Sequence, residues 1–280
     1  MHRIAFTLVF ALSFPAAAHA GKTFDPDRTS GNQLLEYLDH GAWDFRLDAA
    51  KEIKRRCITA ADAQLATLVD KDPNTKVRLA SLVALDHCRM ESALVAAEAA
   101  ALVDSEAHHR RKAISIIEEK GNERSGPVLA QVLEGDPDVD TREKAATVLR
   151  KRAWKGAEVV QEAVAKSAQR ASLRVECVHG LLVLDTKYRS VLHAVTRTET
   201  NDKTRLAFVK LMESEPRAED KGVLLEMLDD GYSHVARHAA RALGNLGDRS
   251  VAPVLRDKSM AVTDRKVAEE FAEQATRLGG

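Results

Sequence analysis

The sequence predicts an all-α fold, a right-handed α-α superhelix (solenoid) of about eight stacked helix pairs. Three observations predict it. An arginine recurs about every 32 residues, an acidic residue stands six positions before most of these arginines, and the composition favours helices. A fixed period of this length is typical of helical repeats, in which each unit packs mainly against its neighbours.

The arginine column defines the repeat. Its first four steps are 32 residues long and its fifth is 31, and a further step of 31 reaches Ala236, beside Arg237. A last step of 29 reaches Arg265, the last arginine of the column, so eight units are expected. Seven of them carry arginine at the aligned position: Arg46, Arg78, Arg110, Arg142, Arg174, Arg205 and Arg265.

An acidic column accompanies the arginines, six positions earlier in each unit. It is broken in units one, five and eight, where His40, Ala168 and Ser259 stand instead. Two columns that share one period are not expected by chance over about 230 residues. The acidic members are Asp72, Asp104, Asp136, Glu199 and Asp230.

Each unit contains two helical stretches joined by a turn. In the first stretch apolar residues recur at three- and four-residue spacing, as in residues 93–103 and 126–133, which predicts an amphipathic helix. The second stretch starts near the arginine and runs about twelve residues. Asp72-Pro73 and Asp136-Pro137 mark the turns, because proline cannot continue a helix. Such a pair cannot bury its apolar face alone, so neighbouring pairs are expected to stack.

At residues 235–248 the sequence reads Val-Ala-Arg-His-Ala-Ala-Arg-Ala-Leu-Gly-Asn-Leu-Gly-Asp. This stretch, with the Asp-x5-Arg spacing, resembles the HEAT repeat family, specifically the short HEAT-like units of phycobilisome-lyase-type proteins. The resemblance covers roughly residues 31–280. It implies that the two columns form a stacked polar ladder at the interhelical turns, and an anion-binding row of arginines is the alternative. The ladder role would fall to Asp72/Arg78, Asp104/Arg110 and Asp136/Arg142.

The N-terminus has the pattern of a secretory signal peptide. A short positive region precedes an almost wholly apolar run at residues 4–14, which is too short to span a bilayer. Ala18-His19-Ala20 fits the small-x-small cleavage pattern, so cleavage before Gly21 is expected, with an uncleaved anchor as the alternative. We therefore expect a periplasmic or secreted protein without a transmembrane segment. Its parts would be a signal peptide at 1–20, a linker at 21–30 and the repeats at 31–280.

Charge and composition restrict the class of partner. Lys and Arg together number 42, as do Asp and Glu, so the formal net charge is zero. Affinity for nucleic acid rests mainly on clustered cations, and no nucleic-acid partner is expected. Two basic runs, Lys54-Arg55-Arg56 and Arg150-Lys151-Arg152, end second helices. We interpret them as complements of the helix dipole, with weak contact to anionic envelope components as the alternative.

Three cysteines occur, and an odd number leaves at least one thiol unpaired within the chain. Cys57 and Cys88 end the second helices of adjacent units. Equivalent positions in neighbouring units usually lie too far apart for a disulfide, which needs Cα atoms within about 7 Å. A one-residue offset and a frayed helix end would allow a Cys57–Cys88 bond. Cys177 lies among small residues and is expected to be a buried free thiol.

No catalytic motif is present, whether a glycine-rich phosphate loop, a nucleophile elbow or a CxxC pair. His234 and His238 lie four apart and could form half of a metal site, but no second His or Cys pair accompanies them. His-Glu dipeptides, which bind iron in some HEAT-like enzymes, do not occur. We therefore expect no catalytic residue, no metal and no cofactor.

The function predicted by the sequence is a non-enzymatic scaffold that binds a protein partner. The alternative is a HEAT-like enzyme or a chromophore- or metal-handling protein of the lyase/hydroxylase-related type. In the family that the chain resembles, the second helices generally line the concave side. Candidate partner contacts on these helices are therefore Glu52, Arg55, Arg111, Glu118, Arg150, Arg241 and Glu269.

Overall fold

The computed structural model describes residues 24–279, and all regular structure in that range is helical. The predicted signal peptide and the linker up to residue 23 lie outside the described residues. The described chain divides into two compact units, the first ending at Lys120 and the second beginning at Gly121. The α-helices contain between 7 and 14 residues, and no helix in the described range is long and apolar enough to cross a bilayer.

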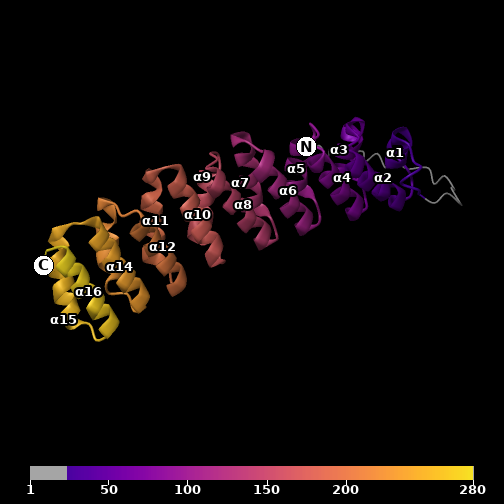
Figure 1. The fold of residues 1–280 in the computed structure, drawn as a ribbon. Helices are drawn as coiled ribbons and strands as arrows, with labels where there is room; N and C mark the ends of the chain where they lie inside the picture. Colours follow the sequence, from indigo (N-terminus) through magenta and orange to yellow (C-terminus); the bar gives the residue numbers. More distant parts are fainter. Residues whose placement is uncertain (1–23, 280) are drawn as a thin grey trace, which may run out of the picture. The chain divides into compact units, whose positions relative to one another are not determined.

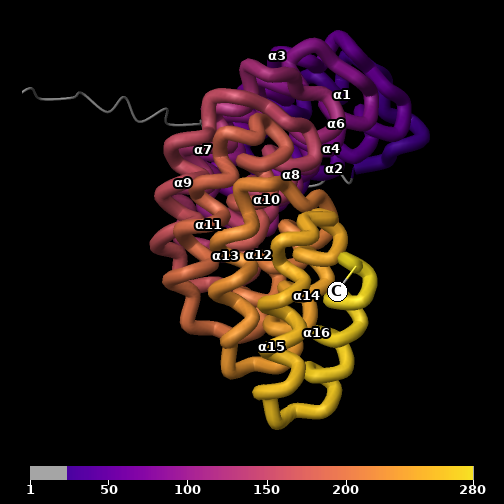
Figure 2. The backbone as a smooth tube through the Cα atoms, turned by 90° about the vertical axis from the view of Figure 1, so that its left-hand side faces the viewer, coloured from indigo at the N-terminus to yellow at the C-terminus, as the bar shows by residue number. Residues whose placement is uncertain are grey.

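Within each unit the helices pair in chain order, and successive pairs lie side by side (Figure 1, Figure 2). Three pairs form the first unit and five form the second, which confirms the predicted all-α fold of stacked helix pairs. The first unit contains α1 (Gly31–Leu38), α2 (Trp43–Arg56), α3 (Asp62–Lys71), α4 (Thr75–His87), α5 (Ala93–Val103) and α6 (Ala107–Lys120). The second contains α7 (Gly126–Gly135), α8 (Val139–Arg152), α9 (Glu158–Ser167), α10 (Ala171–Leu184), α11 (Arg189–Thr198), α12 (Asp202–Ser214), α13 (Lys221–Met227), α14 (Ser233–Leu246), α15 (Ala252–Ala261) and α16 (Arg265–Arg277).

Side-chain caps fix where several of the second helices begin. Asn74 Oδ1 accepts a hydrogen bond from the N–H of Lys76 (2.9 Å), and Asn201 Oδ1 accepts one from Thr204 (3.0 Å). Such oxygens satisfy backbone N–H groups that have no partner in the first turn of a helix. Each cap stands two residues after the acidic column. The helix therefore starts at a constant distance from the acid, and this places the arginine.

The structure corrects the end of the arginine column. From α2 to α12 the repeating arginine is the fourth residue of every second helix. In α14 and α16 the fourth residues are Ala236 and Ala268, which are 32 residues apart. Arg265 is instead the first residue of α16, so its assignment to the column, which rested on a step of 29 residues, is wrong. The period continues to the last pair, but the arginine does not.

Small residues at the seams let the second helices approach closely. Ala145 and Ala146 of α8 and Ala239 and Ala240 of α14 are completely buried. Gly244 of α14 faces the buried amide of Gln274, which a Cβ at this position would overlap. Close approach therefore explains this glycine, which lies inside a helix that it would otherwise weaken.

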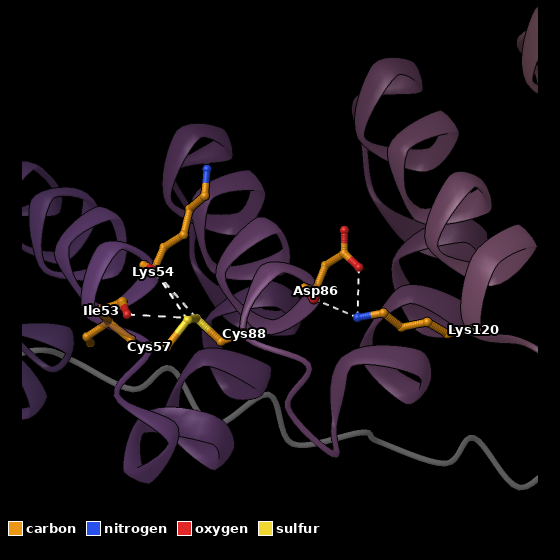
Figure 3. Close-up of a disulfide and its surroundings, with 6 residues drawn as sticks. All are labelled: Ile53, Lys54, Cys57, Asp86, Cys88 and Lys120. Carbon is orange, nitrogen blue, oxygen red and sulfur yellow. Dashed lines mark hydrogen bonds and ion pairs between the residues drawn. A yellow bond between two sulfur atoms is a disulfide. The ribbon is translucent and has the colours of Figure 1, made fainter.

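A disulfide joins the first two second helices, between Cys57 and Cys88 (Figure 3). Cys57 ends α2 in the left-handed conformation (φ 49°), and Cys88 directly follows α4. The Cα atoms are 5.2 Å apart, within the range that a disulfide spans. The left-handed turn at the end of α2 is the physical reason that neighbouring repeats can be bridged here. Cys177 is a buried free thiol, and burial raises its pKa to about 12.

We predict that the Cys57→Ser, Cys88→Ser double variant lowers the free energy of unfolding by about 3 kcal/mol, because the disulfide closes a loop of about 30 residues in the unfolded chain. Urea denaturation followed by circular dichroism measures this loss. Wild-type protein unfolded in the presence of a reductant is the matched control and should unfold at the same urea concentration as the variant. Equal stability of oxidised wild type and the variant would contradict the prediction.

Candidate functional site

The repeating arginines connect consecutive helix pairs at the turns between first and second helices. Arg78 shows the arrangement. Its Nη1 donates to the backbone oxygen of Asp72 in its own turn (3.0 Å), while Nε and Nη2 donate to both carboxylate oxygens of Asp104 in the next turn (2.9 and 3.0 Å). A guanidinium that binds a carboxylate through two parallel hydrogen bonds is a strong and geometrically specific contact.

The same contact recurs in both units. It shows that each acidic residue pairs with a different arginine from the one that the sequence-based prediction grouped with it. Each carboxylate pairs with the arginine of the preceding helix pair, 25 or 26 residues earlier. The arginine six positions later donates to the backbone oxygen of the acidic residue and not to its carboxylate. Asp72/Arg78 is therefore a carbonyl contact and not an ion pair. We call the set the arginine ladder: Arg46–Asp72, Arg78–Asp104, Arg174–Glu199 and Arg205–Asp230. Arg110 likewise donates to the backbone oxygen of Asp104 (2.8 Å).

Each ladder carboxylate also stabilises its own turn. Asp72 Oδ1 accepts the N–H of Asn74 (2.8 Å), and Glu199 Oε1 accepts that of Asn201 (2.8 Å). Asp136 makes the same contact with the N–H of Asp138 (2.8 Å). The carboxylate therefore closes the turn that precedes the second helix, in addition to binding the arginine.

Burial shows that the ladder is part of the core. The side chains of Arg46 and Asp72 are 5% and 1% exposed. Burial raises the pKa of Asp104, but hydrogen bonds from Arg78 and from the N–H of Glu106 outweigh it and hold this pKa below its usual value. The ladder side chains are at most 14% exposed and bind one another. This supports the structural interpretation over an anion-binding row.

Two of the expected ladder members behave differently. Arg265 is 90% exposed, and its Nε binds only Glu269 on its own helix (2.7 Å). Arg142 lies at the expected place on α8, but Ala168 stands where the partner acid would be, and its Nε donates instead to the backbone oxygen of Leu133 (2.8 Å).

The predicted partner contacts lie on the second helices, but their side chains differ in solvent exposure. Glu52 is buried and binds both Arg55 and Arg56. The hydrogen bond from Arg55, and that from Arg56, lower the pKa of Glu52 to about 2 despite its burial. Its assignment as a partner contact is therefore wrong: Glu52 stabilises the end of its own helix.

The other predicted contacts range from half-buried to exposed. The side chains of Arg55 and Glu269 are 63% and 59% exposed. Arg111 and Glu118 on α6 are half-buried and have interactions of their own. Arg150 binds Glu176 of α10 (2.8 Å), and Arg241 binds Glu270 of α16 (2.5 Å).

Ion pairs between consecutive second helices form a second set of links that the sequence interpretation missed. Lys112 of α6 binds Asp86 of α4 (3.1 Å), as Arg150 binds Glu176. Both pairs are separated by 26 residues, and the ladder pairs by 25 or 26. Opposite charges at this fixed separation are a sequence signal that could have revealed these contacts.

A buried carboxylate in the second unit was also missed. Asp220 is completely buried and binds Arg189 through Nε and Nη2 (both 2.7 Å) and His193 through Nε2 (2.7 Å). Burial raises the pKa of Asp220, but the hydrogen bonds from His193 and Arg189 outweigh it and keep this pKa below its usual value. No repeated spacing in the sequence predicts this cluster, because it occurs in a single repeat.

The two histidines of α14 have different surroundings. His238 Nδ1 contacts Glu213 of α12 (2.5 Å), whereas His234 is exposed. Within residues 24–279, no group of three or more His, Cys, Asp or Glu side chains is placed to hold a metal ion.

Comparison with known proteins supports the repeat assignment. Residues 235–258 match the family model of the PBS lyase HEAT-like repeat. The structure of YibA from Escherichia coli is similar, with 17% identity, 90% of this chain and 94% of that chain covered, and a TM-score of 0.52. The complex of CpcE and CpcF of phycocyanin lyase from Nostoc sp. PCC7120 matches with 14% identity, coverage of 96% and 99%, and a TM-score of 0.40. No curated protein sequence matches the chain significantly. The YibA match shows the fold.

We predict that Arg46→Ala lowers the free energy of unfolding by about 3–5 kcal/mol, because it leaves the buried carboxylate of Asp72 without its partner. Arg265→Ala is the matched control, since it removes the same side chain from an exposed position, and should leave stability unchanged. Both are measured by urea denaturation. Equal losses in the two variants would show that the ladder does not stabilise the fold.

We predict that the thermal unfolding midpoint falls as the pH drops below about 4. The folded-state pKa of Asp220 lies below its ordinary value of 3.8, so its contribution is present above that pH and is lost as the pH falls through the lowered pKa. Differential scanning calorimetry between pH 2 and pH 7 measures the fall, and Asp220→Asn should flatten it. An equally steep acid profile in this variant would exclude Asp220 as a cause.

Proposed function

We propose that this chain, which carries a PBS lyase HEAT-like repeat at residues 235–258, is an exported, non-enzymatic scaffold that binds a protein partner. The observation that supports it is the succession of second helices in each unit, which carry charged side chains on an internally braced framework. Helical repeat proteins use such extended surfaces to bind other proteins.

The bracing is relevant to binding because it reduces the entropy cost of association. Arg150 and Arg241 are held by Glu176 and Glu270 from the neighbouring helix pair. A side chain that is already fixed loses less rotamer freedom when a partner binds. We therefore keep the accessible second-helix residues as proposed contacts: Arg55, Arg111, Glu118, Arg150, Arg241 and Glu269.

A second candidate function is that of a HEAT-like enzyme or a chromophore- or metal-handling protein. It is favoured by one observation, the match of residues 235–258 to a repeat model named for PBS lyase. An absorption spectrum and metal analysis of the purified protein separate the candidates. A bound chromophore or stoichiometric metal would favour this second function over the scaffold.

We predict that a partner captured from an envelope extract is lost when exposed charges on second helices are reversed. The test variant combines Arg55→Glu with Glu269→Lys, both at well-exposed positions. The matched control reverses the same charges at exposed positions of first helices, Arg256→Glu with Glu36→Lys. Thermal unfolding verifies that both variants fold. Retention of the partner by the test variant, or no specific capture by wild type, would contradict the proposal.

We propose export through the N-terminal segment, and its test is independent of the partner. When the full chain is produced in a Gram-negative host, the mature protein should be found in the periplasm with Gly21 as its first residue. Fractionation and N-terminal sequencing measure this. Ala20→Arg should block cleavage. A cytoplasmic protein that retains residues 1–20 would contradict export.

A further inference from the structure

The guanidinium of Arg142 lacks the carboxylate that the ladder provides elsewhere. It occupies the ladder position on α8, yet the acidic column is interrupted at Ala168. Within the described part of the chain, its hydrogen bonding is limited to the one from Nε to the backbone oxygen of Leu133 (2.8 Å). Both Nη atoms of Arg142 are therefore available as donors.

A second donor at the same place also lacks its usual acceptor. In the other ladder turns the carboxylate accepts the N–H of the residue two positions later, as Asp72 accepts that of Asn74 (2.8 Å). The equivalent group is the backbone N–H of Arg170, for which no acceptor is found among residues 24–279. Arg142 and the Arg170 N–H are the two groups that converge on a carboxylate elsewhere in the ladder.

The turn itself keeps the geometry of a ladder turn although its carboxylate is absent. Ala168 has φ −64° and ψ 133°, nearly the values of Asp104 (φ −62°, ψ 134°). Arg174 holds this turn by donating to the backbone oxygens of Ala168 (2.6 Å) and Gln169 (3.1 Å). The backbone conformation of the turn is therefore preserved by residues other than the missing acid.

An open pocket lies beside Ala168, the position at which the ladder would place an acid. Its volume is about 580 Å³, and its lining includes Arg142, Ala168, Arg170 and Leu173. In the first unit, where Arg78 and Asp104 are both present, the corresponding pocket is about 230 Å³. We call the larger one the Arg142 pocket.

The charges around the Arg142 pocket leave one cation without a counter-ion. The guanidinium of Arg170 binds Asp140 and Glu143 of α8. No carboxylate belongs to the described lining of the pocket. The positive charge of Arg142 is therefore not balanced by an ion pair, in contrast to the four arginines of the ladder.

We propose that the Arg142 pocket binds a carboxylate group of a ligand, which takes the place of the missing ladder acid. The Nη atoms of Arg142 and the backbone N–H of Arg170 donate to the ligand oxygens. The ladder arginines use Nε and Nη2 for their carboxylates, whereas Nε of Arg142 stays on the backbone oxygen of Leu133. The carboxylate comes either from a small organic acid or from an acidic side chain of a polypeptide. This inference goes beyond the scaffold function and does not depend on it, because a small acid needs no protein partner.

The test is an NMR titration at constant ionic strength that follows the backbone amide of Arg170 and the Nε–H of Arg142. The probes are sodium acetate and a capped tripeptide with one aspartate, while sodium chloride and the asparagine tripeptide are controls. We expect a saturable shift of both signals with a carboxylate probe and none with the controls. Tighter binding of the aspartate peptide identifies a polypeptide source, and tighter binding of acetate identifies a small acid.

Two variants should abolish or weaken ligand binding, one by removing the cation and the other by supplying the missing acid. Arg142→Gln deletes the cation and should weaken binding at least about tenfold. Ala168→Asp restores the missing acid and should abolish binding while raising the thermal unfolding midpoint, so loss of folding cannot explain its result. Ala163→Asp adds the same charge at an exposed position of α9 and should bind as wild type does. No saturable shift in wild type, or wild-type affinity in Ala168→Asp, would overturn the proposal.

Discussion

One contact sets the geometry on which the stack of helix pairs depends. The fourth residue of each second helix from α2 to α12 is an arginine. In the ladder this arginine binds the carboxylate of the next turn, and Arg78 shows that it also binds the backbone of its own turn. The carboxylate in turn accepts a backbone N–H that would otherwise lack a partner. Because these groups are largely buried, a missing partner leaves an uncompensated charge or polar group in the core. The arginine, the acid and the turn are therefore constrained together.

Because the arginine–carboxylate contact repeats, the helix pairs that lack one of its two members are informative. Where arginine and acid are both present, as in Arg78–Asp104, they satisfy each other's charge and hydrogen bonds. Ala168 removes the acid while the turn and Arg142 remain, and a donor set with a pocket results. At the last two pairs Ala236 and Ala268 remove the arginine instead. Specific function in a repeat protein is expected at such local departures, whereas the regular positions support the stack.

The period could be predicted from the sequence because the ladder demands one residue type at one place in each repeat. Three expectations were wrong for physical reasons. Spacing alone places Arg265 in the column, whereas the start of α16 decides the register. Spacing alone also groups Asp72 with Arg78, whereas the carboxylate pairs with the preceding arginine. Glu52 is predicted as a partner contact, but it is buried and binds its neighbours Arg55 and Arg56. The cluster around Asp220 could not be predicted, since it occurs in one repeat and depends on how separate segments fold together.

The central claim is that the arginine and the carboxylate couple neighbouring helix pairs, and a double-mutant cycle tests it most directly. Arg205→Gln and Asp230→Asn, alone and together, remove one ladder contact whose side chains are 13% and 6% exposed. Urea denaturation of the four proteins gives the interaction free energy. The account predicts a favourable coupling of about 1–3 kcal/mol. Additive effects, with no coupling between the two substitutions, would contradict it.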